Sequence, residues 1–317
     1  QVKIMTTYKE IRGTNIEVLA SDPSNPVAGQ VWYNSTSNVV KGSKGALVSA
    51  WSTANALNTG RYNLGGCGTQ TAALGFGGYG PGGRTADTEL YNGTNWTEVN
   101  NLNTAKDSIG GMGISTAALA IGGLSPGSPI TRLAQTETWN GTNWTEVNDQ
   151  NAARANISGV GTTTAGLAFA GGNPGVTNST KLTELWNGTN WTEVNDLNTG
   201  RDGVGAAGTS TAALAFGGDP SPNGETELWN GTNWTEVNDL NTTRANLAGA
   251  GISTAALGFG GSVSPQAQTE TWNGTNWTET GDLNVGRQKL AGGGTNTVAL
   301  AFGGTSTPTA TEEWNIT

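Results

Sequence analysis

The sequence predicts an all-β protein in which repeated four-stranded sheets close into a ring, and three observations lead to this prediction. An 18-residue stretch, ELWNGTNWTEVNDLNTGR at 184–201, recurs in close copies that begin at Glu89, Glu137, Glu227 and Glu270. The repeat region opens with only the second half of this stretch (51–61) and closes with only its first half (312–317). A ring explains that division, because the two ends then share one repeat. The 50 glycines and 12 tryptophans favour strands and tight turns.

Each repeat reads as four strands in succession. In one copy they are expected at 201–208 (RDGVGAAG), 211–218 (TAALAFGG), 225–230 (ETELWN) and 233–240 (NWTEVNDL), and we call them strands a, b, c and d. The Asn-Gly pair between c and d is a strong hairpin signal, because both residues tolerate a positive φ. A Gly-Gly pair ends each strand b, and these pairs begin at Gly77, Gly122, Gly171, Gly217, Gly260 and Gly303.

Six such units in a ring correspond to a six-bladed β-propeller with four-stranded blades. The last blade takes strands a, b and c from 287–317 and its outer strand d from the segment around Trp51. This N-terminal strand would close the ring and leave no open sheet edge.

Length variation between the units lies almost entirely in the connection from strand b to strand c. The distance along the chain from the second glycine of the pair to the Glu of strand c ranges from 8 positions, Gly304 to Glu312, to 14 positions, Gly123 to Glu137. One extra residue within 167–172 (LAFAGG) predicts a β-bulge in that strand b. All b–c connections leave a propeller on one face, and insertions on one face of a repeat protein often mark the binding face.

Residues 1–46 lie outside the repeat and are expected to form an N-terminal attachment arm, while 47–317 form the propeller. Within the arm, GQVWYNSTSNVVKG (29–42) predicts a small β-hairpin around an Asn-Ser-Thr-Ser turn. The segment is too short to bury a core of its own. It either straps onto the propeller or anchors it to a larger body. Met5 is a possible start of the natural chain, which the sequence leaves open.

Several residue types recur once in each unit and are therefore interpreted as architecture. Eleven tryptophans and Tyr91 recur in strands c and d, where they would fill the space between blades. A basic residue opens each strand a, and a Glu precedes each strand-c aromatic residue by two positions. We expect these charges to form six buried ion pairs, since a buried Arg requires a partner. The basic members are Arg61, Lys106, Arg154, Arg201, Arg244 and Arg287, and the acidic members are Glu89, Glu137, Glu184, Glu227, Glu270 and Glu312.

The sequence lacks most of the groups on which catalytic and metal sites depend. It contains no His, and Cys67 is its one cysteine, so neither a Ser-His pair nor a Cys-based zinc site can form. We therefore expect no enzyme activity, no cofactor and no metal. A net charge of −9 argues against nucleic-acid binding, and no apolar run is long enough to insert into a membrane. Carboxylates outside the repeat, such as Asp87, leave a propeller glycosidase or lyase as an alternative.

The repeat resembles the kelch repeat over 47–317. The resemblance rests on LAFGG at 214–218, ELW at 227–229, Trp234 and the basic residue Arg244, a combination that recurs six times. It implies a kelch-like propeller, as in the central domain of galactose oxidase. The copper enzymes of that group bind their metal through His and Tyr, so their activity is not implied here. The units are also shorter than the roughly 50 residues of a typical kelch repeat.

The arm, together with near-identical blades, resembles tail-fibre and virion-surface proteins of tailed phages. That resemblance implies a non-enzymatic protein on the surface of the particle, held to other virion proteins by the arm, and it leaves room for a homo-oligomer. Its b–c loops would bind a receptor or glycan on the host cell. The candidate ligand-binding residues lie in the three longest loops: Tyr79, Arg84, Asp87, Arg132 and Lys181. The alternative is a purely structural decoration or adaptor protein of the virion.

Overall fold

The computed structural model describes residues 16–23, 30–42, 49–172, 179–220 and 223–316. The chain divides into two compact units, and the larger one is Ser49–Ile316. All the regular secondary structure among the described residues is β-strand.

The larger unit contains a four-stranded antiparallel sheet that recurs six times among the described residues. Sheet 1 consists of β5 Gly65–Thr69, β6 Ala72–Phe76, β9 Thr88–Tyr91 and β10 Trp96–Val99. Sheet 2 consists of β11 Gly110–Ile114, β12 Ala117–Ile121, β13 Thr136–Trp139 and β14 Trp144–Val147. Sheet 3 consists of β15 Ser158–Gly161, β16 Gly166–Phe169, β17 Thr183–Trp186 and β18 Trp191–Glu193.

The remaining three sheets follow the same order. Sheet 4 consists of β19 Gly205–Thr209, β20 Ala212–Phe216, β21 Thr226–Trp229 and β22 Trp234–Val237. Sheet 5 consists of β23 Ala248–Ile252, β24 Ala255–Phe259, β25 Thr269–Trp272 and β26 Trp277–Glu279. Sheet 6 consists of β27 Ala291–Gly294, β28 Val298–Phe302, β29 Thr311–Ile316 and β4 Ser49–Ala54.

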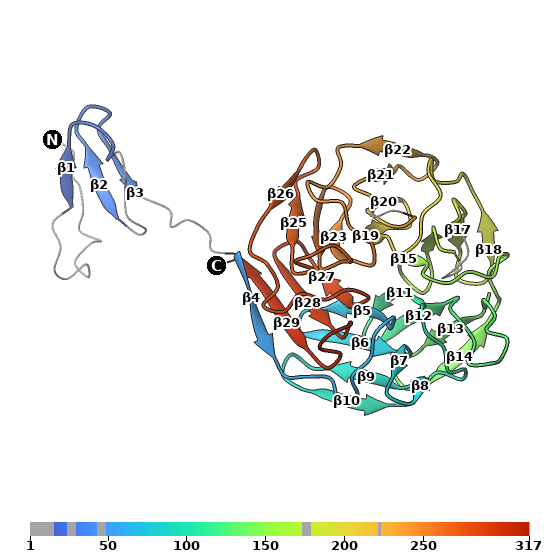
Figure 1. Ribbon diagram of the computed structural model, residues 1–317. Helices are drawn as coiled ribbons and strands as arrows, with labels where there is room; N and C mark the ends of the chain where they lie inside the picture. The colour runs from blue at the N-terminus through green and yellow to red at the C-terminus, as the bar shows by residue number, and fades with distance from the viewer. Residues whose placement is uncertain (1–15, 24–29, 43–48, 173–178, 221–222, 317) are drawn as a thin grey trace. The chain divides into compact units, whose positions relative to one another are not determined.

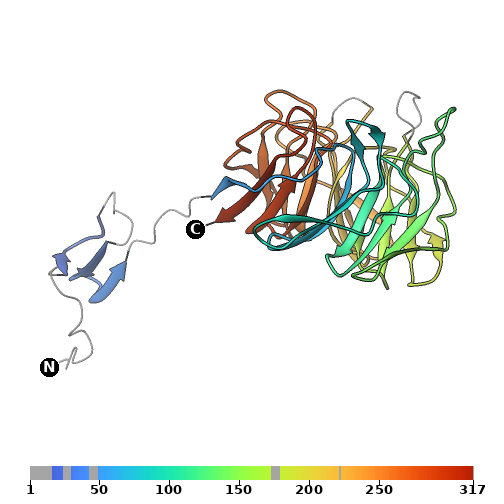
Figure 2. The same cartoon turned by 90° about the horizontal axis from the view of Figure 1, so that it is seen from below.

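The first strand of each sheet lies nearest the centre of the unit, and the last strand lies at its periphery (Figure 1). Viewed from the side, the sheets stand next to one another around this centre (Figure 2). Each innermost strand contacts the innermost strands of the sheets before and after it, and β27 contacts β5. This all-β architecture of repeated sheets is compatible with a β-propeller.

Sheet 6 combines strands from the two ends of the larger unit. Strand β4 pairs antiparallel with β29 along its whole length, and Trp51 lies opposite Trp314 in that register. In sheet 5 the corresponding pair is Trp277 and Trp272. The segment around Trp51 therefore occupies the position of an outer strand d.

Glycine is required where the innermost strands approach one another. A Cβ atom on Gly111 would lie 2.7 Å from the carbonyl oxygen of Gly66, and one on Gly249 would lie 2.3 Å from that of Ala206. No real Cβ contact is that short, so larger residues at these positions would push neighbouring sheets apart. The glycine-rich sequence of strand a therefore follows from packing at the centre.

The bulge predicted within 167–172 is wrong. Ala168 pairs with Glu184 in the same register in which Ala215 pairs with Glu227, so strand β16 contains no extra residue. Ala170, at φ 61°, takes the place that Gly217, at φ 69°, occupies in sheet 4. The sequence suggested an insertion because Ala170 stands where the other repeats have the first glycine of the Gly-Gly pair, and a second glycine, Gly172, follows Gly171.

Aromatic side chains fill the spaces between consecutive sheets. Between sheets 4 and 5, for example, Phe216 packs against Trp277 with ring centroids 4.8 Å apart. Each strand-d tryptophan also donates an indole hydrogen bond of 3.0–3.1 Å to a strand-c threonine of the preceding sheet. These pairs are Trp51–Thr269, Trp96–Thr311, Trp144–Thr88, Trp191–Thr136, Trp234–Thr183 and Trp277–Thr226. The twelve repeated aromatics therefore act as core residues.

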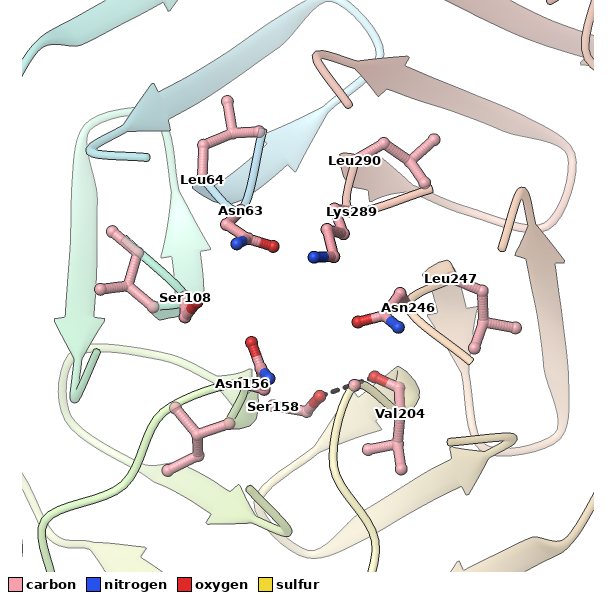
Figure 3. A pocket seen from close by; sticks show the side chains of 13 residues that line it. Asn63, Leu64, Ser108, Asn156, Ser158, Val204, Asn246, Leu247, Lys289 and Leu290 are labelled. Atoms are coloured by element: carbon pink, nitrogen blue, oxygen red, sulfur yellow. Dashed lines mark hydrogen bonds between the residues drawn. The ribbon is translucent and has the colours of Figure 1, made fainter. Parts of the chain in front are cut away.

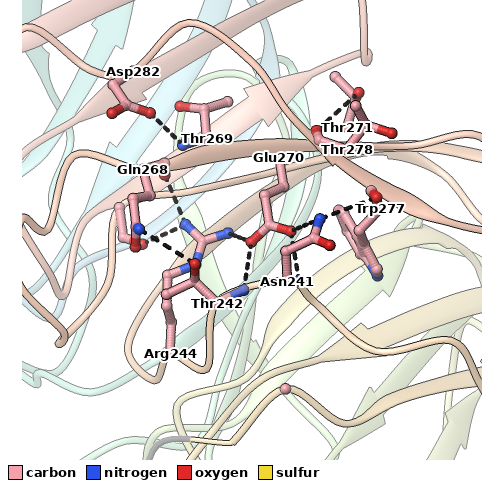
Figure 4. A network of polar contacts seen from close by, with 12 residues as sticks. Asn241, Thr242, Arg244, Gln268, Thr269, Glu270, Thr271, Trp277, Thr278 and Asp282 are labelled. Carbon is pink, nitrogen blue, oxygen red and sulfur yellow. Dashed lines mark hydrogen bonds and ion pairs between the residues drawn. The ribbon is translucent and has the colours of Figure 1, made fainter.

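The six ion pairs expected from the repeat are present, with N–O distances of 2.7–3.0 Å and both partners buried. In the pair shown in Figure 4, Arg244 donates to Glu270 and to the carbonyl oxygens of Gly260 and Gln268. Asn241 donates its backbone and side-chain N–H groups to the other oxygen of Glu270. Burial lowers the pKa of Arg244, and Glu270 opposes that shift. These hydrogen bonds therefore hold the segment that connects sheet 4 to sheet 5 against sheet 5 itself.

The smaller unit contains one strand more than the predicted hairpin. Strands β2 Val31–Asn34 and β3 Val39–Gly42 pair antiparallel as expected, but β1 Glu17–Leu19 adds to β2 in parallel. Asp22 accepts hydrogen bonds from Trp32 and Asn34 and forms an ion pair with Lys41, and these contacts lower its pKa to about 2. Two parallel strands need a longer connection than a hairpin turn, so the sequence contains no turn motif that predicts the pairing of β1 with β2.

Candidate functional site at the mouth of the axial channel

A narrow channel runs between the innermost strands of the six sheets. Its walls are mainly glycine and alanine backbone of β5, β11, β15, β19, β23 and β27. At one end it opens into a cavity of about 120 Å³, which we call the axial mouth. The residues that line the mouth precede or begin these strands, and six of their side chains are polar: Asn63, Ser108, Asn156, Ser158, Asn246 and Lys289.

The backbone around the axial mouth forms a closed cycle of six hydrogen bonds. In each sheet the second residue after the repeated basic residue donates its N–H to the carbonyl of the equivalent residue in the preceding sheet. The distances are 2.7–3.2 Å, and the donor–acceptor pairs are Ser108–Asn63, Asn156–Ser108, Gly203–Asn156, Asn246–Gly203, Lys289–Asn246 and Asn63–Lys289. This cycle places five side chains and Gly203 at one level around the axis.

The same six residues adopt the left-handed backbone conformation, with φ between 51° and 60°. Glycine and asparagine tolerate this region well, which suits Asn63, Asn156, Gly203 and Asn246. Serine and lysine are found there less often, so Ser108, at φ 56°, and Lys289, at φ 59°, are the unusual members.

Hydrogen bonds to aspartates orient the carboxamides of the axial mouth. The amide nitrogen of Asn63 donates to Asp107 at 3.5 Å, and that of Asn246 donates to Asp219 at 3.2 Å. Their carbonyl oxygens consequently face the centre, where the Lys289 ammonium group also points (Figure 3). The mouth thus presents acceptors and a charged donor to the same small space.

An aromatic and charged cluster borders the mouth beside sheet 1. The rings of Tyr62 and Tyr79 stack with centroids 5.4 Å apart, and the Lys289 nitrogen lies 6.0 Å from the Tyr62 centroid. The Arg84 guanidinium lies 5.7 Å from the Tyr79 centroid and pairs with Asp107 at 2.7 Å. Tyr79 and Arg84 are held opposite each other by the short hairpin of β7 Tyr79–Gly80 and β8 Gly83–Arg84.

Asp202 lies on another side of the mouth, where burial raises its pKa. The hydrogen bond from Ser179 lowers this pKa, the nearby charge of Asp219 raises it, and Asn156 and Lys289 lower it. The ammonium group of Lys289, which lowers this pKa, points toward the cavity (Figure 3).

The structure brings together two of the five sequence-predicted ligand residues. Tyr79 and Arg84 belong to the cluster at the axial mouth. Asp87 instead interacts with Asn101 at 3.4 Å, Arg132 bridges to Leu124 through its backbone, and Lys181 donates to the carbonyl oxygen of Asn198 at 2.6 Å. None of the contacts described for these three residues is to Tyr62, Tyr79, Arg84 or Lys289.

Sequence reasoning missed the polar residues that line the mouth, although a signal for them existed. The two positions after each repeated basic residue vary as Tyr-Asn, Asp-Ser, Ala-Asn, Asp-Gly, Ala-Asn and Gln-Lys, while an apolar residue always follows. Variation inside an otherwise repeated connection marks residues that face the shared axis. The differences in length between the b–c loops are the stronger signal, and they led to ligand-binding residues being predicted in those loops.

No protein-family model matches the chain, and no curated protein sequence matches it. Among the described residues there is no group of three or more His, Cys, Asp or Glu side chains that could hold a metal ion. In that same part of the chain, no helix has the length and apolar character needed to cross a membrane.

Proposed function

We propose that residues 47–317 form a six-bladed, kelch-like β-propeller in which strand β4 closes the ring. Three cyclic arrangements support this: the contacts between innermost strands, the indole–threonine hydrogen bonds, and the backbone cycle at the axial mouth. In all three arrangements, the contacts between sheet 6 and sheet 1 are of the same kind as those between the other neighbouring sheets.

We further propose that the protein is a non-enzymatic component of a phage virion surface, such as a tail fibre, that binds a receptor on the host cell. The observation that carries the binding role is the unrepeated cluster of Tyr62, Tyr79, Arg84 and Lys289 at the axial mouth. The charges of the repeated ion pairs are buried and paired with each other, whereas this cluster combines aromatic faces with hydrogen-bonding groups. Aromatic faces beside such groups suit the apolar and hydroxyl surfaces of a glycan.

The N-terminal arm is proposed to attach the protein to other virion proteins. Its small sheet leaves four valines exposed, Val18, Val31, Val39 and Val40. Exposed apolar residues concentrated on a few strands are typical of protein–protein contacts. The same surface could join copies of the chain into a homo-oligomer.

An adsorption-competition experiment tests the binding role. Purified full-length chain is added to host cells before intact particles, alongside a Tyr79→Ala/Arg84→Ala variant. We expect dose-dependent blocking by the unmodified chain and at least tenfold weaker blocking by the variant. Absence of blocking by a folded chain at high excess would contradict receptor binding and favour a structural decoration or adaptor protein. Release of sugar from host polysaccharide would instead indicate a glycosidase or lyase.

A further inference from the structure

We propose that the axial mouth binds the carboxylate group of an acidic sugar and that Lys289 pairs with it. This inference rests on the proposed receptor-binding function, because it names the chemistry of the ligand for that same face.

Lys289 is a half-buried cation that forms no ion pair in the described part of the chain, although its charge lowers the pKa of Asp202. Its nitrogen lies 6.0 Å from the centroid of Tyr62, and no ion pair or hydrogen bond joins it to another described side chain. Arg84, by contrast, is paired with Asp107 at 2.7 Å. An ammonium group in this position binds a ligand carboxylate more strongly than a neutral group, because hydrogen bonds between charged partners are stronger than those between neutral ones.

The backbone conformation of Lys289 independently indicates a role for this side chain. It holds a φ of 59°, and at similar values the five equivalent positions carry asparagine three times, glycine once and serine once. A bulkier residue kept in this region is a local strain of the kind that gathers at ligand sites. Asparagine would satisfy the same backbone cycle with less strain.

The other groups of the mouth match the hydroxyl groups of a sugar. The carboxamide oxygens of Asn63 and Asn246 face the centre as acceptors (Figure 3). Ser108 is buried, with 4% of its surface exposed, and its hydroxyl has no hydrogen-bond partner among the described residues. Sugar hydroxyls can both donate to these oxygens and accept from the serine.

The aspartates around the mouth do not cancel this preference. Arg84 neutralises Asp107, and Asn246 donates to Asp219 from the side away from the centre. Asp202 accepts hydrogen bonds from Ser179 and Asn156, and although the charge of Lys289 lowers its pKa, burial is the larger effect and raises it. The carboxylates therefore stand behind a layer of polar side chains, while Lys289 reaches into the cavity.

The size of the cavity limits what can enter it. A cavity of about 150 Å³ holds one benzene ring. The axial mouth, at about 120 Å³, accepts a carboxylate and the carbon atoms next to it. The rest of a sugar ring would remain outside, next to the face of Tyr62.

Calorimetric titration of the full-length chain tests the inference. The probes are galacturonic acid, glucuronic acid and N-acetylneuraminic acid, each compared with its uncharged methyl ester. We expect at least one acid to bind tenfold or more tightly than its ester. Lys289→Asn should abolish that difference, whereas Lys181→Asn, which removes the same charge from an exposed b–c loop, should preserve it.

Equal binding of acid and ester, or no binding of any acid, would overturn the inference, as would an equal loss in both lysine variants. Thermal unfolding of each variant shows whether the fold is intact, and Lys289→Asn should melt no lower than the unmodified chain. If adsorption competition succeeds while the acids fail, the receptor-binding function stands and this ligand assignment falls. If the acids bind through Lys289 while competition fails, the site stands and the virion role falls.

Discussion

Replacing Lys106 by arginine should stabilise the protein, because the repeated ion pair works better with a guanidinium group. In sheets 3 to 6 the arginine pairs with Glu and also donates to two backbone carbonyls, as Arg201 does to Gly217 at 2.9 Å and Glu225 at 2.6 Å. Lys106 lies 3.0 Å from Glu137, but neither the lysine nitrogen nor that glutamate oxygen has a well-directed hydrogen bond. The guanidinium of Arg201 reaches all three acceptors, whereas the ammonium group of Lys106 makes no hydrogen bond of this kind.

The expected gain follows from the added hydrogen bonds. Two bonds from a charged donor to carbonyls contribute up to about 1.5–3 kcal/mol each, and the longer side chain loses some rotamer entropy. We therefore expect the free energy of unfolding to rise by about 1–3 kcal/mol for Lys106→Arg. At about 2–4 °C per kcal/mol, the melting temperature should rise by several degrees.

Urea denaturation and differential scanning calorimetry measure this change. The matched control is the reverse substitution, Arg201→Lys, which should lower stability by a similar amount. A Lys106→Arg variant that is no more stable than the unmodified chain would refute the assignment of the gain to the carbonyl bonds. The reasoning would also fail if Arg201→Lys had no effect.

Three further predictions follow from buried groups. Gln150→Leu should raise the free energy of unfolding, measured by urea titration, by about 1–2 kcal/mol. Both polar atoms of the Gln150 amide are buried without partners, and leucine occupies the equivalent position in the other five repeats. A lower free energy of unfolding for this variant would contradict the prediction. Glu270→Ala should cost about 3–5 kcal/mol by leaving a buried guanidinium unpaired, whereas the exposed Glu279→Ala serves as the control and should change stability little. Burial raises the pKa of Cys67 to about 12, so a thiol reagent at pH 8 should label it only after unfolding, and rapid labelling of the native protein would count against its burial.

The repeated sheets could be predicted from the sequence because their determinants are local and occur six times. The Asn-Gly turns set each c–d hairpin, and the spacing of Glu and Trp sets the register that the structure contains, as in the pairing of Trp229 with Trp234. The ion pairs were predictable for the same reason. A charge that recurs at one position of every repeat needs a partner that recurs with it.

Other features depend on contacts between distant segments and could not be predicted in this way. Strand β1 joins the arm in parallel, without a turn to announce it. The axial mouth brings together residues from six connections, and its grouping of Tyr62 with Lys289 depends on the order of sheets around the axis. The loop candidates Asp87, Arg132 and Lys181 were chosen by loop length, which does not say how near a residue lies to the centre.

Hydrogen–deuterium exchange of the full-length chain, with and without purified host surface polysaccharide, tests the proposed binding face most directly. The proposal predicts slower exchange for amides at 62–63, 79–84 and 288–289, around the axial mouth and its neighbouring hairpin. The c–d hairpins, such as the one at 230–233, should exchange at an unchanged rate. Protection confined to those hairpins, or to the N-terminal arm, would contradict the proposal.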